Sequence, residues 1–218
     1  MDRTSKGKAC LRPVCPRPYN LGKRQALVDE SRRQVLDAAR ALLGGAARYT
    51  AFTVDAVAAR ADVARATVYY QFGSKTGLLE ALCDDLAGDG QMADLAGAFA
   101  NPEPVGALAD FVACFGRFWQ ADRRVMRRLR ALAALDPEVG QVVADRDDRR
   151  RQGLGVLVDR LAARYPTPPL GDRDRSVRVL LALTGFEIFD ALAGTRALDA
   201  VSGEIAGLAG AALGLPAP

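Results

Sequence analysis

Apolar residues recur along this chain at helical spacing, and no stretch alternates in the way that predicts a strand. A first helix is predicted from about Asp29 to Gly44-Gly45, with an apolar face made of Val35, Leu36, Ala39, Leu42 and Leu43. Thr53 is placed to cap a second, short helix, and Asp55 lies in its first turn, where a negative charge is favourable. Its apolar side comprises Val54, Val57, Ala58 and Ala61.

Residues 61–63 separate this helix from a third one, which is predicted from about Ala64 to Phe72 and ends at Gly73. Ser74 then caps a fourth helix that turns Leu78, Leu79 and Leu82 inward. Two short helices joined by three residues, the first capped and the second flanked by cations, are typical of a helix-turn-helix.

Beyond residue 88 the pattern stays helical. We expect a helix opened by Pro102 and Pro104, helices at 122–135 and 136–164, a loop at 165–172, and two closing helices at 173–193 and 198–213. The predicted fold class is therefore all-α, with an N-terminal three-helix helix-turn-helix domain and a C-terminal helical domain.

Two adjacent tyrosines, Tyr69 and Tyr70, lie within the predicted third helix. If Val68 faces the core, Tyr70 and Ala66 lie nearly opposite on the helical wheel, and Tyr69 and Thr67 lie on the flanks. Both phenols must then leave the core. A phenol hydroxyl can donate to a phosphate, and its ring can pack on sugar or on a thymine methyl, so a nucleic-acid surface is predicted here.

The stretch TVDAVAARADVARATVYYQFGSK, residues 53–75, resembles the DNA-binding domain of the tetracycline-repressor (TetR) family. The resemblance implies a phosphate contact for Thr53, base-edge contacts for Arg65, Ala66 and Thr67, and backbone and base contacts for Tyr69 and Tyr70. It implies a further phosphate contact for Lys75, and Gln71 stands where a histidine is common and can bond a phosphate or an adenine. Two other departures are Asp62 at the turn position usually held by glycine, and Ala64 at the cap often held by serine.

The same resemblance implies a homodimer that binds a double-stranded DNA operator and responds to a small-molecule effector in its C-terminal half. The predicted division is a disordered basic arm at 1–28, the DNA-binding domain at 29–88, and a ligand-binding and dimerisation domain at 89–218. Two apolar stripes could pair with their symmetry mates. They consist of Val177, Leu180, Leu181, Thr184 and Ile188, and of Leu198, Val201, Ile205, Leu208 and Ala212. The alternative is that both stripes pack only within the subunit.

A ligand pocket is predicted from an aromatic-rich set of side chains: Phe111, Phe115, Phe118, Trp119, Met126, Leu129, Phe186 and Phe189. Plain core packing is the alternative for these residues. Gly116, Gly153, Gly155 and Gly185 fall inside predicted helices, where small residues leave room or permit close crossing. The five arginines of DRRVMRRLR, residues 122–130, either form a solvated face paired with DRDDRRR at 145–151 or bind an anionic ligand.

Positive charge is concentrated in the first residues of the chain. The net charge is only +4, but residues 1–28 carry seven cations and one acid. Pro13, Pro16 and Pro18 lie among these cations, which predicts a disordered arm. The arm either contacts DNA or is a solvated tail, since a basic segment is favoured near a polyanion.

The absence of histidine excludes His-dependent nucleophilic catalysis and most zinc sites, so no enzyme, metal or cofactor is expected. FGSKTG lacks the spacing of a phosphate loop. Cys83 and Cys114 are predicted to be small buried hydrophobes, and a disulfide or metal at Cys10 and Cys15 is not favoured. With no signal peptide and no apolar run of membrane length, the chain is expected to be cytoplasmic. A helical small-molecule-binding protein with weakened DNA binding is the alternative to a ligand-responsive repressor.

Overall fold

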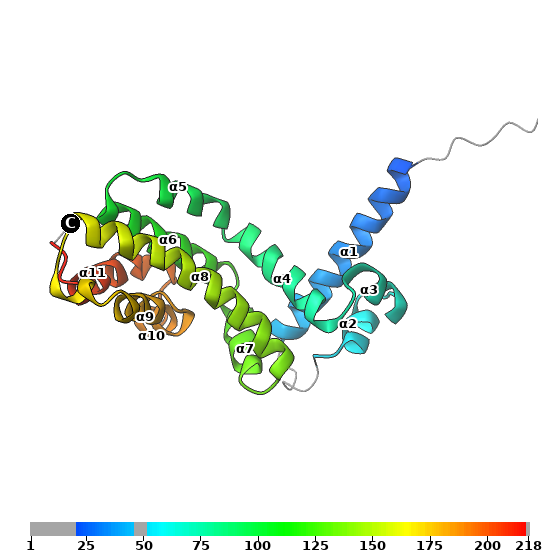
Figure 1. Cartoon of the computed structure of the whole chain (residues 1–218). Coiled ribbons are helices and arrows are strands. Elements are labelled where there is room, and N and C mark those ends of the chain that lie inside the picture. Colours follow the sequence, from blue (N-terminus) through cyan, green and yellow to red (C-terminus); the bar gives the residue numbers. More distant parts are fainter. Residues whose placement is uncertain (1–20, 46–51, 217–218) are drawn as a thin grey trace, which may run out of the picture.

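The computed structural model describes residues 21–45 and 52–216, and these residues form helices and connecting turns without a strand. The order of elements is α1 (Leu21–Gly44), α2 (Val54–Arg60), α3 (Arg65–Phe72), α4 (Lys75–Asp89), η2 (Met92–Asp94), α5 (Leu95–Ala100), α6 (Pro104–Ala121), α7 (Arg123–Ala133), α8 (Pro137–Arg164), η3 (Pro168–Gly171), α9 (Arg173–Leu183), α10 (Phe186–Ala193), η4 (Asp199–Val201) and α11 (Ser202–Ala212). The all-α prediction is confirmed. Figure 1 shows α1, α2 and α3 at one end of the molecule and the C-terminus at the other.

The amino-terminal unit is built by local signals that the sequence carries. The Thr53 hydroxyl accepts from the amide of Ala56 and caps α2, as predicted. Asp62 adopts a left-handed backbone with φ 53°, which gives the turn between α2 and α3 its direction. Val68 and Phe72 are the buried residues of α3, and they join Val35 and Val57 in a small core.

Helix α4 links this unit to the rest of the chain. Ser74 caps it by accepting from the amide of Gly77, and Leu78, Leu79 and Leu82 are fully buried. Its contacts run from α1 and α3 to α6 and α8, so one helix touches both halves of the molecule. Figure 1 shows α4 extending from the α2–α3 end towards α5 and α6.

The carboxy-terminal part surrounds the apolar helix α6. Asp122 and Asp136 cap α7 and α8 with their carboxylates, which confirms both predicted helix starts. Gly116 lets α10 and α11 approach α6 closely, because an added Cβ would overlap Ser202 Oγ and lie 3.2 Å from Cα of Asp199. Cys83 and Cys114 are buried free thiols, as predicted.

Several predicted boundaries were wrong. Helix α1 begins at Leu21 rather than near Asp29, because no proline or glycine pair interrupts residues 23–43. Residues 92–100 form η2 and α5, which the pattern did not reveal, and Pro104, not Pro102, opens α6. The predicted helix at 173–193 breaks into α9 and α10, since Gly185 is extended, with φ −73° and ψ 152°.

Two further expectations concern the ends and the environment of the chain. The predicted arm falls largely in residues 1–20, which lie outside the described residues together with Cys10 and Cys15. Within the described ranges, no helix has the length and apolar character needed to cross a membrane.

Candidate nucleic-acid interface and internal cavity

The front of α3 presents polar and aromatic side chains to solvent. Val68 is turned inward, and the side chain of Tyr70 is 86% exposed while that of Tyr69 is 39% exposed. Arg65 and Ala66 are exposed and Thr67 is half-buried. The prediction that both phenols leave the core is confirmed. Arg65, Ala66, Thr67, Tyr69 and Tyr70 are called the recognition surface below.

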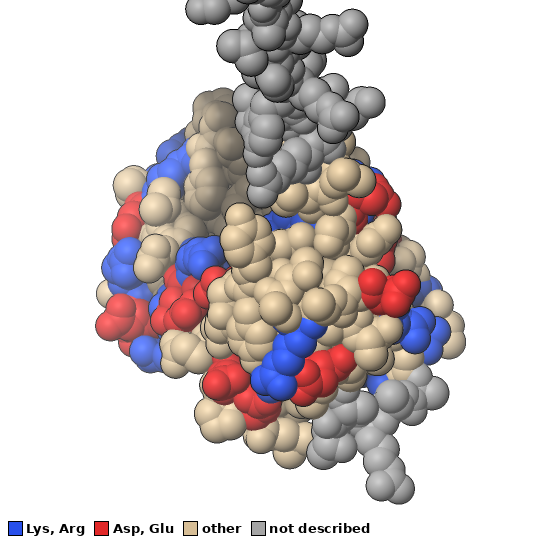
Figure 2. Space-filling view, turned by 90° about the vertical axis from the view of Figure 1, so that its right-hand side faces the viewer, with Lys and Arg blue, Asp and Glu red and all other residues tan. Residues whose placement is uncertain are grey.

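Arg65 is held in place by its neighbours. Its guanidinium lies 3.0 Å from a carboxylate oxygen of Asp55 on α2 and donates to the Tyr69 hydroxyl at 3.2 Å. It also lies over the Tyr69 ring, 5.4 Å from the ring centroid. Figure 2 views this end of the molecule and shows a broad uncharged area with acidic and basic side chains around it. The described part of the face is therefore mixed in charge.

Two predicted DNA contacts are placed differently. The side-chain amide of Gln71 donates to the Ser31 hydroxyl of α1 at 3.2 Å, and the backbone carbonyl of Gln71 accepts from the Arg32 guanidinium. Gln71 thus joins α3 to α1 instead of facing outward, because it follows the exposed Tyr70 by one helical step. The Lys75 ammonium forms an ion pair with Asp136, the cap of α8, and is not displayed on the open surface. Thr53, which with Lys75 is one of the two predicted contacts outside α3, is exposed while it caps α2.

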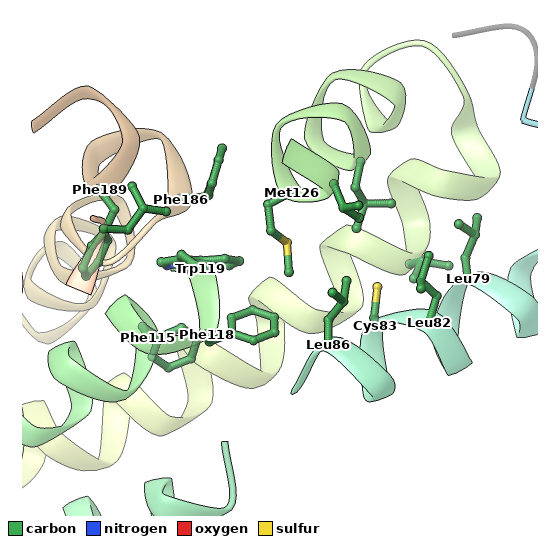
Figure 3. Close-up of a cluster of buried hydrophobic side chains, with 14 of the residues drawn as sticks. Leu79, Leu82, Cys83, Leu86, Phe115, Phe118, Trp119, Met126, Phe186 and Phe189 are labelled. Atoms are coloured by element: carbon green, nitrogen blue, oxygen red, sulfur yellow. The ribbon is translucent and has the colours of Figure 1, made fainter. Parts of the chain in front are cut away.

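An internal cavity of about 360 Å³ lies between α4, α6, α7 and α8. Six of the eight predicted ligand-binding residues line it: Phe111, Phe115, Phe118, Trp119, Met126 and Leu129. Figure 3 shows Phe115, Phe118 and Trp119 of α6 on one side, Cys83 and Leu86 of α4 on the other, and Met126 reaching between them. Its volume falls in the lower part of the range of ligand pockets, ~300–1,000 Å³.

Phe186 and Phe189 do not line this cavity, so the structure brings only part of the predicted set together there. Phe186 packs edge-on against Trp119, with centroids 5.8 Å apart, on the side away from the cavity residues. Phe189 is fully buried, and its ring lies against Gly116 on α6. Because the chain breaks at Gly185, α10 supports the cavity wall from behind instead of forming it.

The cavity has one strongly polar side, formed by α8. Arg150 is 6% exposed, and it donates to the Thr184 carbonyl at 2.7 Å and to Asp147 at 3.1 Å. Its guanidinium carbon lies 5.6 Å from the ring centroids of both Phe115 and Trp119. Burial lowers the pKa of Arg150 to about 10, so the side chain remains protonated at neutral pH.

Sequence reasoning named the charged segments at 122–130 and 145–151 but did not place Arg146 and Arg150 at the cavity. Arg130 pairs with Asp147 at 3.0 Å and with Glu187 at 2.7 Å, and Arg146 pairs with Asp84 at 2.7 Å. Arg130 of the arginine-rich segment thus pairs with 145–151, as one alternative held, and Arg123 and Arg127 pair with Asp190 of α10. The available signal was the spacing of Arg146, Arg150 and Gly153, which places all three on one face of α8.

Comparison with known proteins bears on the amino-terminal unit. Residues 35–82 match the model for the bacterial regulatory proteins of the tetR family. This match agrees with the resemblance that residues 53–75 carry.

Solved structures of regulators show the same fold. A TetR-like transcriptional regulator from Rhodococcus sp. RHA1 has a TM-score of 0.61 at 23% identity over 84% of this chain and 96% of its own. FadR from Bacillus subtilis, solved in complex with stearoyl-CoA, has a TM-score of 0.63 at 15% identity over 81% and 96%. PfmR from Thermus thermophilus, a TetR family regulator, has a TM-score of 0.58 at 19% identity over 85% and 96%. No curated protein sequence matches the chain.

The structure divides the predicted dimer residues into buried and exposed groups. Those already buried within the chain are Val177, Leu180, Thr184, Leu198, Val201 and Ile205. These six have no surface left for a partner, so their assignment to an interface is corrected. Leu181, Ile188 and Ala212 are half-buried, and Leu208 is 49% exposed. The inner stripe of α11 serves the subunit core, as the alternative reading of the stripes held.

Proposed function

We propose that this protein is a ligand-responsive repressor of the tetR family that binds a palindromic operator as a homodimer. The recognition surface supplies the DNA contacts, one copy per half-site, and Thr53 and the α2 amino end lie beside it for phosphate contact. Repression follows from occupancy of the operator. The single observation that carries the proposal is the exposure of Tyr70, at 86%, on a formed helix-turn-helix.

Helix α4 provides the link between ligand and DNA. It begins three residues after Phe72, the end of α3, and it supplies Cys83 and Ala87 to the cavity. A ligand that displaces α4 in the cavity therefore changes the position of α3. A ligand shifts DNA binding only if it binds one arrangement of α4 more tightly than the other. The similarity in fold to FadR, solved with stearoyl-CoA, is consistent with a ligand in this half of the molecule.

The homodimer is proposed to use the outward face of α11. Its inner face, Val201, Ile205, Ala209 and Leu213, is buried in the subunit. The outer face carries Glu204, Gly207, Leu208 and Ala211, which are exposed. Only one of these four is charged, and the small residues permit close approach of a second helix.

The first experiment measures binding of the purified full chain to its own upstream intergenic DNA by fluorescence anisotropy across a salt series. Binding at least ~10³-fold tighter than to a random duplex is expected of a sequence-specific regulator. Tyr70→Ala should weaken the operator complex at least ~10-fold, because an exposed ring that stacks or bonds DNA is lost. Val156→Ala, an exposed apolar residue on α8, is the matched control and should change nothing.

Equal, weak binding to both duplexes would contradict a site in this upstream DNA and would favour the alternative of a helical ligand-binding protein with weakened DNA binding. The formed turn at Asp62 and the exposed recognition surface argue against that alternative.

A further inference from the structure

The polar side of the cavity carries more positive charge than its partners neutralise. Four arginines line the cavity, Arg130, Arg146, Arg149 and Arg150. Their carboxylate partners within the described residues are Asp147, Glu187 and Asp84, and Asp147 is shared by Arg130 and Arg150. Arg130, Arg146 and Arg150 are thus matched by three carboxylates, and Arg149, which is exposed, adds one further positive charge to the lining.

Two of these guanidinium groups also retain an unused donor. The Nε atoms of Arg146 and Arg150 are buried and have no acceptor among the described residues. The two residues are four apart on α8, so their side chains leave the helix on the same face. A buried donor without an acceptor costs ~1–3 kcal/mol, and more when it belongs to a charged group. Arg150, at 6% exposure, is the more deeply buried of the two.

The rest of the cavity is apolar and shaped to receive a hydrophobic body. Gly153, one turn beyond Arg150, leaves space that the Phe99 and Phe111 rings approach, since an added Cβ would lie 3.1 Å and 3.4 Å from them. Phe115 and Trp119 flank the guanidinium of Arg150 itself. Burial raises the pKa of the Cys83 thiol, so the α4 wall is uncharged at neutral pH.

We propose that the cavity binds an amphipathic monocarboxylic acid, with its carboxylate at the Nε–H groups of Arg150 and Arg146 and its apolar body among the α6 aromatics. The two oxygens of one carboxylate match the two unused Nε–H donors. A cationic ligand is disfavoured by the four arginines. A neutral ligand brings no negative charge to the two donors. The inference names the ligand class of the cavity on which the proposed repressor function rests.

The test uses decanoate as the acid probe and decanol as its neutral match. Trp119 is the only tryptophan of the chain and lines the cavity, so its fluorescence reports occupancy without DNA. Decanoate is expected to bind at least ~10-fold more tightly than decanol, since a hydrogen bond to a charged group contributes ~1.5–3 kcal/mol. Decyltrimethylammonium should bind more weakly than either. 4-Phenylbutyrate then distinguishes aromatic acids from straight-chain acids.

Substitutions of the cavity arginines test where the carboxylate of the ligand binds. Arg150→Gln keeps an amide N–H near the Nε position but loses the positive charge and the terminal nitrogen that donates to the Thr184 carbonyl, and should weaken decanoate binding ~10- to 100-fold with little effect on decanol. Arg151→Gln changes the next residue of α8, which pairs with Asp148 and does not line the cavity, and should bind both probes as the unaltered chain does. If Arg150→Gln does not fold, Arg146→Gln makes the same comparison at the second donor.

Equal affinity of the unaltered chain for decanoate and decanol would overturn the proposal, as would an equal loss of both probes in Arg150→Gln. Binding of none of the probes would overturn it together with the ligand site. Addition of decanoate to the operator complex distinguishes the inference about the ligand from the proposed repressor function. Binding of the acid without release of DNA would support the inference and contradict the ligand-responsive repressor.

Discussion

Two residues of the helix-turn-helix depart from the pattern that the family resemblance implies, and each takes the backbone conformation that the motif needs. Asp62 is left-handed at φ 53°, a conformation that aspartate tolerates better than most residues. Ala64 is extended, with φ −67° and ψ 143°, which is the geometry of a helix cap, but no side chain satisfies the amides of α3. The motif thus forms without its usual side-chain cap, and a capping residue at position 64 would increase the stability of the fold.

Ala64→Ser should stabilise the folded chain by about 1 kcal/mol, because serine at a cap accepts from a free amide of the first turn. The measurement is the midpoint of urea unfolding, which should rise without a change in the slope. Ala59→Ser, at an exposed position near the end of α2, is the control and should lower the midpoint slightly, since serine has a lower helix propensity than alanine. An unchanged midpoint in Ala64→Ser would show that the α3 amides are already satisfied.

At the scale of helices, close crossings and single ion pairs decide how the elements meet. Gly116 permits the approach of α10 and α11 to α6, and the Lys75–Asp136 pair joins the start of α4 to the start of α8. The Lys75 hydrogen bond holds the pKa of Asp136 below its usual value, so the Asp136 carboxylate is ionised at neutral pH. Both features act between elements, and neither follows from the helix in which the residue lies.

Gly116→Ala should destabilise the chain by ~1–3 kcal/mol, because the new methyl would overlap Ser202 and crowd the Phe189 ring at 3.1 Å. Thermal or urea unfolding measures the change. Gly88→Ala is the matched control, since an added Cβ on this exposed residue of α4 meets no atom within 4 Å. It should stabilise by up to ~1 kcal/mol through helix propensity. Equal effects of the two changes would contradict the close crossing.

Asp136→Asn should release Lys75 for the phosphate contact that the family resemblance implies. Asparagine still caps α8, so the fold is retained, while the charge partner of the ammonium is lost. Binding to random and operator DNA should both tighten, and the salt dependence should steepen by ~0.9 for each phosphate gained. Lys75→Ala combined with Asp136→Asn should abolish the gain. Equal salt slopes for Asp136→Asn and the unaltered chain would exclude a DNA contact by Lys75.

The three proposed binding sites lie one after another along the molecule. The recognition surface lies at one end, the cavity lies between α4 and the helices around α6, and the exposed face of α11 lies towards the other end (Figure 1). The three proposed sites therefore do not overlap. Helix α4 contacts α3 and lines the cavity, and α6 lines the cavity and contacts α11, so we expect coupling between the sites to pass through these two helices.

Leu208→Arg should convert the proposed homodimer into monomers at micromolar concentration, because a charge is buried against its own symmetry mate. Sedimentation velocity measures the change, and operator affinity should fall with it. Leu135→Arg is the control, since Leu135 is an exposed leucine between α7 and α8. A dimer that survives Leu208→Arg would place the interface elsewhere.

Local signals made much of the fold and part of the site predictable. Caps at Thr53, Ser74, Asp122 and Asp136 act within three residues, and the Val68 phase alone decides that Tyr69 and Tyr70 are exposed. These interactions hold whatever packs against the helix. The same reasoning did not locate Phe186, Gln71 and the buried dimer stripe, since a helical stripe shows which residues are apolar but not which surface covers them.

The sequence by itself determined the helices of the helix-turn-helix, its outward tyrosines and an aromatic face on α6, because each depends on neighbours within about one helical turn. Tertiary structure alone decided the polar side of the cavity. The break after α9 leaves the Thr184 carbonyl accepting from both Trp119 and Arg150, which are 65 and 34 residues away. Such pairs form only when helices distant in sequence are packed together, and that packing turned a run of charged residues on α8 into a buried guanidinium beside an aromatic cavity.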